Sequence, residues 1–98
     1  KVFRVYVWDP APGQTQQLLE NFATAKRIHE SLGARVESYS EGIGGTGNFH
    51  YTLGFESWGT LAEFFVKLAT NEEWAAFQAS NDPTAATLVH SYQASGLN

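Results

Sequence analysis

Hydrophobic and polar residues alternate in two ways along this chain, and each way predicts one type of secondary structure. Residues 3–8, FRVYVW, are rich in β-branched and aromatic side chains and end at a run of proline and glycine, which predicts a strand. From residue 15 to residue 32 apolar residues recur at steps of three and four, which predicts a helix with Gly33 just past its end. The same reading predicts strands at 34–41, 48–55 and 86–93, a helix capped by Ser57 that carries Leu61, Phe64, Phe65 and Leu68, and a short helix that starts at Asn71.

This order of elements predicts a single α+β domain over residues 1–98. It is βαββαβ with an extra short helix before the last strand, so right-handed crossovers place the helices on one face of a four-stranded antiparallel sheet, as in a ferredoxin-like sandwich. Side chains alternate between the two faces of each strand. We predict that the more apolar set lies under the helices, namely Phe3, Val5 and Val7 in the first strand and Phe49, Tyr51, Leu53 and Phe55 in the third. The other face is predicted to meet a second copy of the chain through Arg4, Tyr6, Trp8, His50, Thr52, His90 and Tyr92.

Composition and charge exclude several classes of function. Of 98 residues 43% are hydrophobic and 16% are charged, which is typical of a folded domain. The net charge is −4 with six Lys plus Arg, so neither nucleic acid nor an anionic membrane is an expected partner. Without cysteine there is no thiolate chemistry, and no apolar run approaches the roughly 20 residues that span a bilayer. We expect a cytoplasmic location, while a targeting segment before Lys1 stays an open alternative.

Two nucleotide-related motifs overlap in residues 42–57. Gly42, Gly44 and Gly47 satisfy the spacing GxGxxG, but that fingerprint needs a helix after the third glycine, and here a strand follows. We therefore interpret these glycines as a hairpin loop. Residues 47–51 resemble the third-strand signature of RNA-recognition motifs, but Thr46 replaces the expected basic residue and the net charge has the wrong sign. The strand alternation also predicts that Tyr6 and Tyr51 lie on opposite faces, which would leave no common platform for stacked bases.

A different resemblance covers residues 2–93. Pro12-Gly13 after the first strand, Phe55-Glu56-Ser57 at the end of the third and Asn71-Glu72-Glu73-Trp74-x-x-Phe77 resemble the dimeric α/β-barrel superfamily, including antibiotic-biosynthesis-monooxygenase-like and NIPSNAP-like proteins. The resemblance implies a homodimer in which two sheets pair face to face. The Asn, Trp and His that catalytic or haem-degrading members use would fall on Tyr51, Phe55 and Phe64 or Phe65, so none is retained. No cofactor is therefore expected.

The remaining candidates are an aromatic pocket and three histidines. We predict a ligand pocket lined by Tyr51, Phe55, Phe64, Phe65 and Trp74, suited to a flat apolar molecule held by one hydrogen bond. Histidine is the side chain best placed for proton transfer near neutral pH, so the candidate catalytic residues are Tyr51, His50 and His90. His29 lies beside the apolar stripe of its helix and is predicted at the surface. No metal-ligand spacing such as HExxH occurs, so no metal site is expected.

Two classes of function stay open at this point. One is a cofactor-independent isomerase, cyclase or oxygenase that acts on an aromatic or polyketide-like molecule, with Tyr51 or His50 handling the proton. The other is a module that binds a small hydrophobic molecule, or pairs with itself, without chemistry. Both predict a homodimer, and fold alone does not choose between them.

Overall fold

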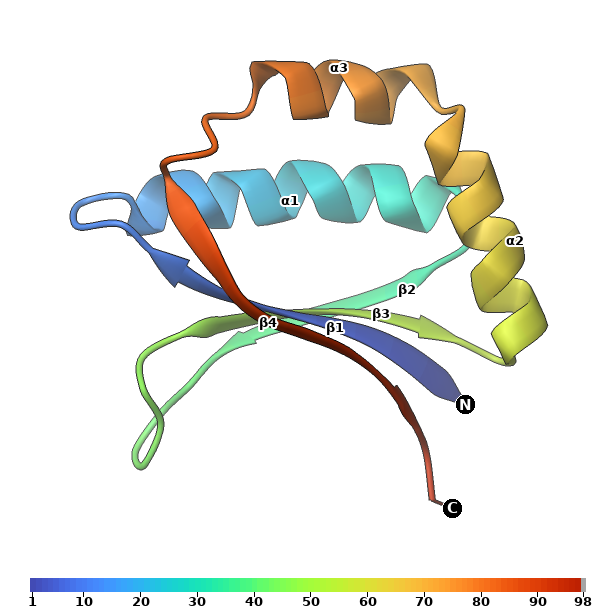
Figure 1. Ribbon diagram of the computed structural model, residues 1–98, viewed down its shortest axis with the longest axis horizontal. Helices are drawn as coiled ribbons and strands as arrows, with labels where there is room; N and C mark the ends of the chain where they lie inside the picture. The colour runs from blue at the N-terminus through green and yellow to red at the C-terminus, as the bar shows by residue number, and fades with distance from the viewer. Residues whose placement is uncertain (98) are drawn as a thin grey trace.

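The structure is a computed structural model that describes residues 1–97 (Figure 1). Its elements follow the predicted order, with each strand and helix close to its predicted range. The bounds are β1 Val2–Pro10, α1 Thr15–Ser31, β2 Arg35–Ser40, β3 Phe49–Phe55, α2 Trp58–Ala69, α3 Glu72–Ser80 and β4 Ala86–Ser95. The fold is α+β and ferredoxin-like, as the pattern predicted.

The four strands form one antiparallel sheet in the order β2-β3-β1-β4. All three helices lie on the same side of the sheet (Figure 1). We call the opposite side, which none of these helices covers, the open face. The two central strands of the sheet are β3 and β1. Each has one set of side chains on the helix-covered face and the other set on the open face. Within residues 1–97 no helix combines the length and the apolar character needed to cross a membrane.

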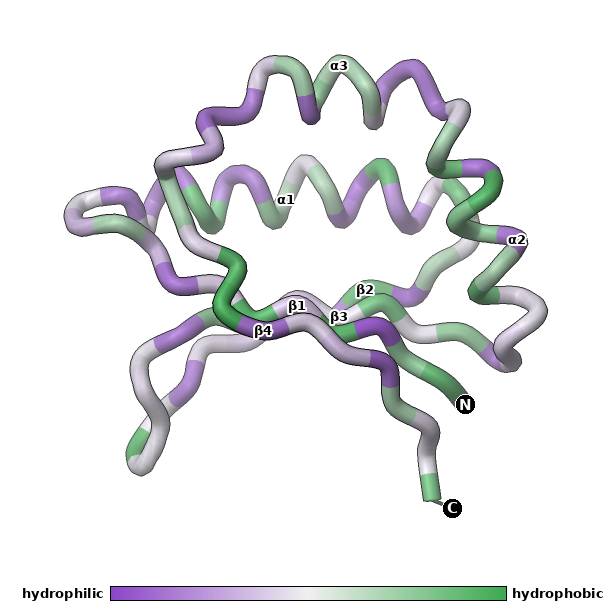
Figure 2. Tube along the Cα trace, in the orientation of Figure 1, coloured by the Kyte–Doolittle hydropathy of each residue, from purple (hydrophilic) through white to green (hydrophobic). Residues whose placement is uncertain are grey.

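Local sequence explains where the helices begin and which side they bury. Ser57 caps α2 by accepting a hydrogen bond from the backbone N–H of Thr60, and Asn71 caps α3 in the same way at Trp74. Along α1 hydrophobic and hydrophilic residues alternate (Figure 2), and its apolar stripe packs on the sheet. The main core holds Val2, Leu18, Phe22, Ala25, Ile28, Ala34, Val36, Tyr51, Leu53, Phe55, Leu61, Phe64 and Leu68.

The predicted facing of β3 agrees with the structure, whereas the predicted facing of β1 is wrong. Across the β1–β3 pair, Tyr6 lies opposite Tyr51 and Trp8 opposite Phe49. Residues directly opposite share a face, so Arg4, Tyr6 and Trp8 lie on the face covered by the helices and not on the open face. Phe3, Val5 and Val7 are exchanged to the open face. The prediction that Tyr6 and Tyr51 lie on opposite faces is wrong for the same reason. Both tyrosines lie on the face that the helices cover.

The physical reason for the exchange is that β1 is apolar on both sides. Val5 and Val7 are buried although no helix covers them, and they lie outside the main core cluster. Hydrophobicity alone therefore favoured the valines as the helix-facing set. The strand register decides instead, because a slip by one residue would turn every side chain of β1 to the wrong face relative to β3.

The glycine-rich loop is a hairpin connection between β2 and β3, as predicted. Gly44 and Gly47 have φ angles of 88° and 82°, a region that side-chain-bearing residues rarely adopt. No helix follows the loop, because β3 begins at Phe49. The loop therefore lacks the helix N-terminus that a dinucleotide phosphate needs.

Candidate functional site

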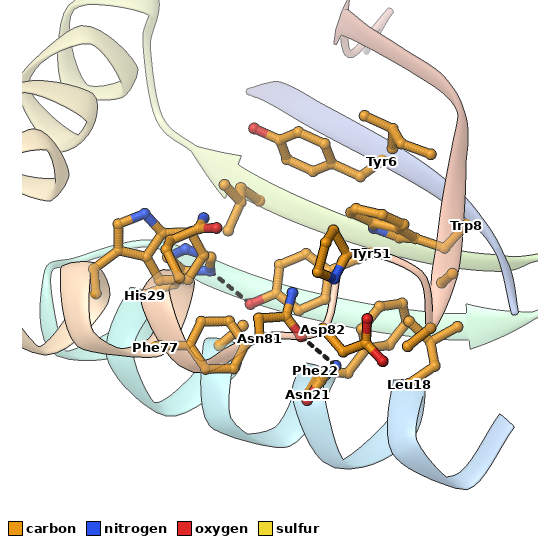
Figure 3. A pocket seen from close by; sticks show the side chains of 18 of the residues that line it. Tyr6, Trp8, Leu18, Asn21, Phe22, His29, Tyr51, Phe77, Asn81 and Asp82 are labelled. Atoms are coloured by element: carbon orange, nitrogen blue, oxygen red, sulfur yellow. Dashed lines mark hydrogen bonds between the residues drawn. The ribbon is translucent and has the colours of Figure 1, made fainter. Parts of the chain in front are cut away.

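A pocket of about 630 Å³ lies between the sheet and the helices. This volume is within the roughly 300–1,000 Å³ of small-molecule sites in proteins. The floor is formed by β1 and β3, and the walls come from α1, α2, α3 and the start of β4 (Figure 3). Its aromatic lining residues are Tyr6, Trp8, Phe22, Tyr51, Phe65, Trp74 and Phe77. We call this space the central pocket.

Two polar side chains meet at the wall of the central pocket. The hydroxyl oxygen of Tyr51 on β3 lies 2.7 Å from Nδ1 of His29 on α1 (Figure 3). Both side chains are almost fully buried, with 4% of each residue exposed. Aromatic rings enclose the imidazole, with the centre of the Trp74 ring 4.5 Å away and that of Phe64 at 5.6 Å.

Burial keeps both members of this pair neutral. It lowers the pKa of His29 to about 4, because the charged imidazolium would lose its hydration. It raises the pKa of the Tyr51 hydroxyl, and the negative charge of Glu30 and the proximity of Tyr6 add to this effect. At neutral pH the site therefore presents a neutral phenol bonded to a neutral imidazole. Such a pair can donate or accept hydrogen bonds without carrying a charge.

The prediction that His29 lies at the surface is wrong. Leu18, Phe22 and Ala25 precede His29 at steps of four, three and four, which places the histidine on the buried face of α1. This spacing was a usable signal in the sequence. The prediction placed His29 beside the apolar stripe of α1, whereas the structure places it within the buried stripe. The cost of burying a polar side chain there is met by Tyr51, which supplies a hydrogen-bond partner from the sheet. Nε2 of His29 is buried without a partner within residues 1–97.

The five predicted pocket residues separate into two groups. Tyr51, Phe65 and Trp74 line the central pocket. Phe55 and Phe64 do not, because both are packed in the core, with their ring centres 5.1 Å apart. Sequence reasoning missed the pocket residues contributed by β1, since Tyr6 and Trp8 had been placed on the other face.

Polar groups also mark the end of the pocket next to the α3–β4 connection. The side chains of Asn21 and Asn81 are joined by a hydrogen bond of 2.9 Å, which ties α1 to the end of α3 (Figure 3). Asp82 follows, and its carboxylate accepts hydrogen bonds from the hydroxyl and backbone N–H of Thr84. These bonds lower the pKa of Asp82, so this end of the pocket carries a negative charge.

The other predicted catalytic residues lie on the open face, away from the central pocket. Nε2 of His50 is 2.7 Å from a carboxylate oxygen of Glu41, and the imidazole stacks on Tyr39 with ring centres 4.8 Å apart. The second carboxylate oxygen of Glu41 accepts hydrogen bonds from Thr46 and closes the hairpin loop. The bonds from His50 and Thr46 lower the pKa of Glu41 to about 2. This pair therefore has a structural role in the loop.

His50 and His90 do not form the predicted cluster with Arg4 and Tyr6. Each histidine lies opposite Val7, one on either side of β1, so a full strand separates them. Arg4 and Tyr6 belong to the helix-covered face. His90 instead packs beside Tyr92, with ring centres 5.1 Å apart, and these two residues lie on the open face as predicted.

The geometry determines which kinds of chemistry the central pocket can support. Its only charged lining residue is Asp82 at one end, and no set of three His, Cys, Asp or Glu in the described part of the chain is arranged to hold a metal ion. The body of the pocket is aromatic, and its interior polar group is the Tyr51–His29 pair. A ligand would be recognised by shape and by a hydrogen bond to this pair.

Fold and pocket together place the chain in a structural class, the ferredoxin-like α+β sandwiches with a pocket between sheet and helices. By sequence, the chain matches no protein-family model and no curated protein. Several solved structures have the same fold. An uncharacterised NIPSNAP domain protein from Burkholderia xenovorans aligns over 96% of this chain and 90% of its own, with a TM-score of 0.73 at 15% identity.

Two further structures widen this comparison. A NIPSNAP family protein of unknown function from Agrobacterium tumefaciens aligns over 95% of this chain and 83% of its own, with a TM-score of 0.71 at 17% identity. A Deinococcus radiodurans protein proposed to be an antibiotic biosynthesis monooxygenase covers all of this chain and 94% of its own, with a TM-score of 0.65 at 9% identity. The fold expected from the resemblance is thereby confirmed, and at these identities the likeness concerns the fold alone.

Proposed function

We propose that this protein binds a small, flat, mainly aromatic molecule in the central pocket. The observation that carries the proposal is the buried hydrogen bond between Tyr51 and His29 in the wall of an aromatic pocket of about 630 Å³. Buried polar groups are costly, and a phenol–imidazole pair placed at a pocket wall gives a ligand both orientation and specificity. The comparisons support the fold on which this pocket is built.

The chemistry of the pair indicates which ligand group it recognises. When Nδ1–H of His29 donates to the Tyr51 oxygen, the Tyr51 hydroxyl is free to donate its proton to a ligand acceptor. A carbonyl or quinone oxygen is such an acceptor. An aromatic carbonyl compound therefore matches the apolar body of the pocket and its internal hydroxyl.

Replacing Tyr51 by phenylalanine tests this proposal. The variant keeps the ring and loses the hydroxyl, so affinity for aromatic ketones and quinones should fall about tenfold, the effect of one lost hydrogen bond of about 1.4 kcal/mol. Aromatic hydrocarbons of the same size should bind with unchanged affinity. Calorimetric titration with matched pairs, such as a naphthoquinone and naphthalene, measures both quantities.

Tyr39→Phe is the matched control, since Tyr39 is 53% exposed on the open face. It should leave both affinities at the wild-type value. Circular dichroism shows whether Tyr51→Phe retains the fold. Equal affinity of folded Tyr51→Phe and wild type for the carbonyl ligand would contradict the proposal.

A second candidate function is cofactor-independent isomerisation or cyclisation, and the Tyr51–His29 pair is also what favours it. A hydroxyl that donates to a ligand carbonyl stabilises the negative charge that develops on this oxygen when a water molecule takes up the α-proton and the enolate forms. The expected result is enzyme-dependent exchange of the α-hydrogen of an aromatic ketone in deuterated water, followed by NMR and lost in Tyr51→Phe. Binding without exchange in the wild type leaves the protein as a binding module.

We also propose that the open face pairs with a second copy of the chain. Val5 and Val7 are buried there without a helix above them, and large apolar side chains beside them remain exposed, among them Tyr39 at 53% and Tyr92 at 37%. A strand that is apolar on both sides, as β1 is, is stabilised by a cover on both sides. A twofold arrangement would supply that cover from the same surface.

The substitution Tyr92→Glu tests this pairing. A symmetric dimer of the variant would bury two new carboxylates, one from each chain, without cationic partners. This burial is costly, so the variant should be monomeric. Light scattering coupled to size-exclusion chromatography gives the mass: twice the chain mass is expected for the wild type and one chain for the variant. Val66→Glu on α2, also an exposed apolar position, is the control and should remain dimeric. A monomeric wild type at high micromolar concentration would contradict the pairing.

A further inference from the structure

Arg4 is the most unusual polar residue on the helix-covered face. It lies on β1 between Val2 and Tyr6, next to Leu53 of β3 in the sheet. Its guanidinium carbon is 5.3 Å from the centre of the Tyr6 ring, so the side chain leans towards the central pocket. Within residues 1–97 Arg4 takes part in no ion pair. A partly buried guanidinium is normally balanced by a carboxylate, and in the described part of the chain none lies within ion-pair distance of Arg4.

Two hydrogen-bonding atoms at this position are buried without partners in the described chain. One is Nε of Arg4 and the other is the hydroxyl oxygen of Ser91 on β4. Ser91 is directly opposite Tyr6, and Arg4 is two residues from Tyr6 along β1, so the three side chains share one face of the sheet. Buried donors are rarely left unpaired, and two at one place indicate a group that is absent from the chain itself.

The charges along β1 give the pocket a direction. Asp82 puts a negative charge at the end next to the α3–β4 connection, close to where β1 finishes. Arg4 puts a positive charge near the other end of the strand, towards α2. Between them lie Tyr6 and Trp8, which belong to the aromatic lining. An elongated ligand with one anionic end would therefore be attracted in a single orientation.

We propose that Arg4, Ser91 and Tyr6 form an anion subsite next to the central pocket, and that the ligand is an aromatic molecule that carries a carboxylate. The proposal rests on the proposed binding function and names its ligand class. The guanidinium and the Ser91 hydroxyl donate to the carboxylate, while the aromatic body lies over Tyr6 and Trp8. Charge-assisted hydrogen bonds of this kind are roughly twice as strong as neutral ones.

Matched pairs of ligands test the subsite. Wild-type protein is titrated with 2-naphthoate and with the isosteric neutral 2-naphthamide. Naphthoate is expected to bind at least tenfold more tightly, and this preference should disappear in Arg4→Gln while the affinity for naphthamide is kept. Ser91→Ala should reduce the preference by a smaller factor. Lys26→Gln removes the same unit of charge from the exposed side of α1 and should leave the preference intact.

Each result has a distinct meaning. If the wild type binds both ligands equally, the anion subsite is refuted and the proposed binding function stands. If neither ligand binds, both proposals fail. If acetate or inorganic phosphate competes with naphthoate as effectively as benzoate does, the site takes free anions and the assigned ligand class is wrong. If Arg4→Gln does not fold, Ser91→Ala decides: an unchanged preference in that variant refutes the role of the subsite.

Discussion

Lowering the pH from 7 to 4 is expected to reduce the free energy of unfolding by about 3 kcal/mol through His29 alone. Burial lowers the pKa of this imidazole from 6.5 to about 4 in the folded protein. Between these two values the unfolded chain binds a proton that the folded chain does not, so stability is full above pH 6.5 and is lost as the pH falls towards 4. Each tenfold difference in proton affinity corresponds to about 1.4 kcal/mol.

Urea unfolding at several pH values measures this loss, and the variant His29→Gln serves as the control. Glutamine cannot take up the proton, so stability of the variant should be nearly flat between pH 6.5 and 4.5. The hydrogen-bonded Glu41 acts in a lower window, since its pKa falls from 4.5 to about 2 and its contribution is lost only below pH 4.5. A wild type and a variant with the same slope above pH 4.5 would show that His29 is not buried as described.

Replacing Phe64 by alanine is expected to lower the free energy of unfolding by roughly 3–5 kcal/mol, the range for removal of a buried aromatic side chain. Phe64 is 2% exposed and packs against Phe55, Phe65 and His29. A loss of this size is a large fraction of the 5–15 kcal/mol that stabilises a typical domain. Denaturant unfolding followed by circular dichroism measures it.

The neighbouring residue provides a control that separates core from pocket. Phe65 is half-buried and lines the central pocket, so Phe65→Ala should cost less stability than Phe64→Ala and should weaken ligand binding. Equal losses of stability in the two variants would contradict the assignment of Phe64 to the core and Phe65 to the pocket wall.

The order of elements could be predicted from sequence because each element carries its own local signal. The helix of residues 15–31 has its apolar stripe, Ser57 and Asn71 are caps, and Gly44 and Gly47 permit a turn. Those signals depend on near neighbours in the chain. They were sufficient for the ferredoxin-like fold and for the helix-facing side of β3.

The site could be predicted only in part, because it depends on pairing between distant segments. Tyr51 was recognised as the polar group of an aromatic pocket, yet its partner His29 is 22 residues away on another element. The facing of Tyr6 depends on its register with Tyr51, and β1 itself is apolar on both sides. Arg4 looked like an open-face residue for the same reason. Register between strands is a tertiary property that the alternation within one strand does not determine.

The proposed binding of an aromatic molecule in the central pocket can be tested most directly with the three tryptophans. Trp8 and Trp74 line the pocket, whereas Trp58 is 47% exposed at the start of α2 and lies outside it. In an ¹H–¹⁵N spectrum the three indole N–H signals can be assigned with single Trp→Phe variants. Titration with 2-naphthoate is predicted to shift the signals of Trp8 and Trp74 in a saturable way and to leave that of Trp58 in place. Saturable binding that leaves the signals of Trp8 and Trp74 unmoved would contradict this proposal.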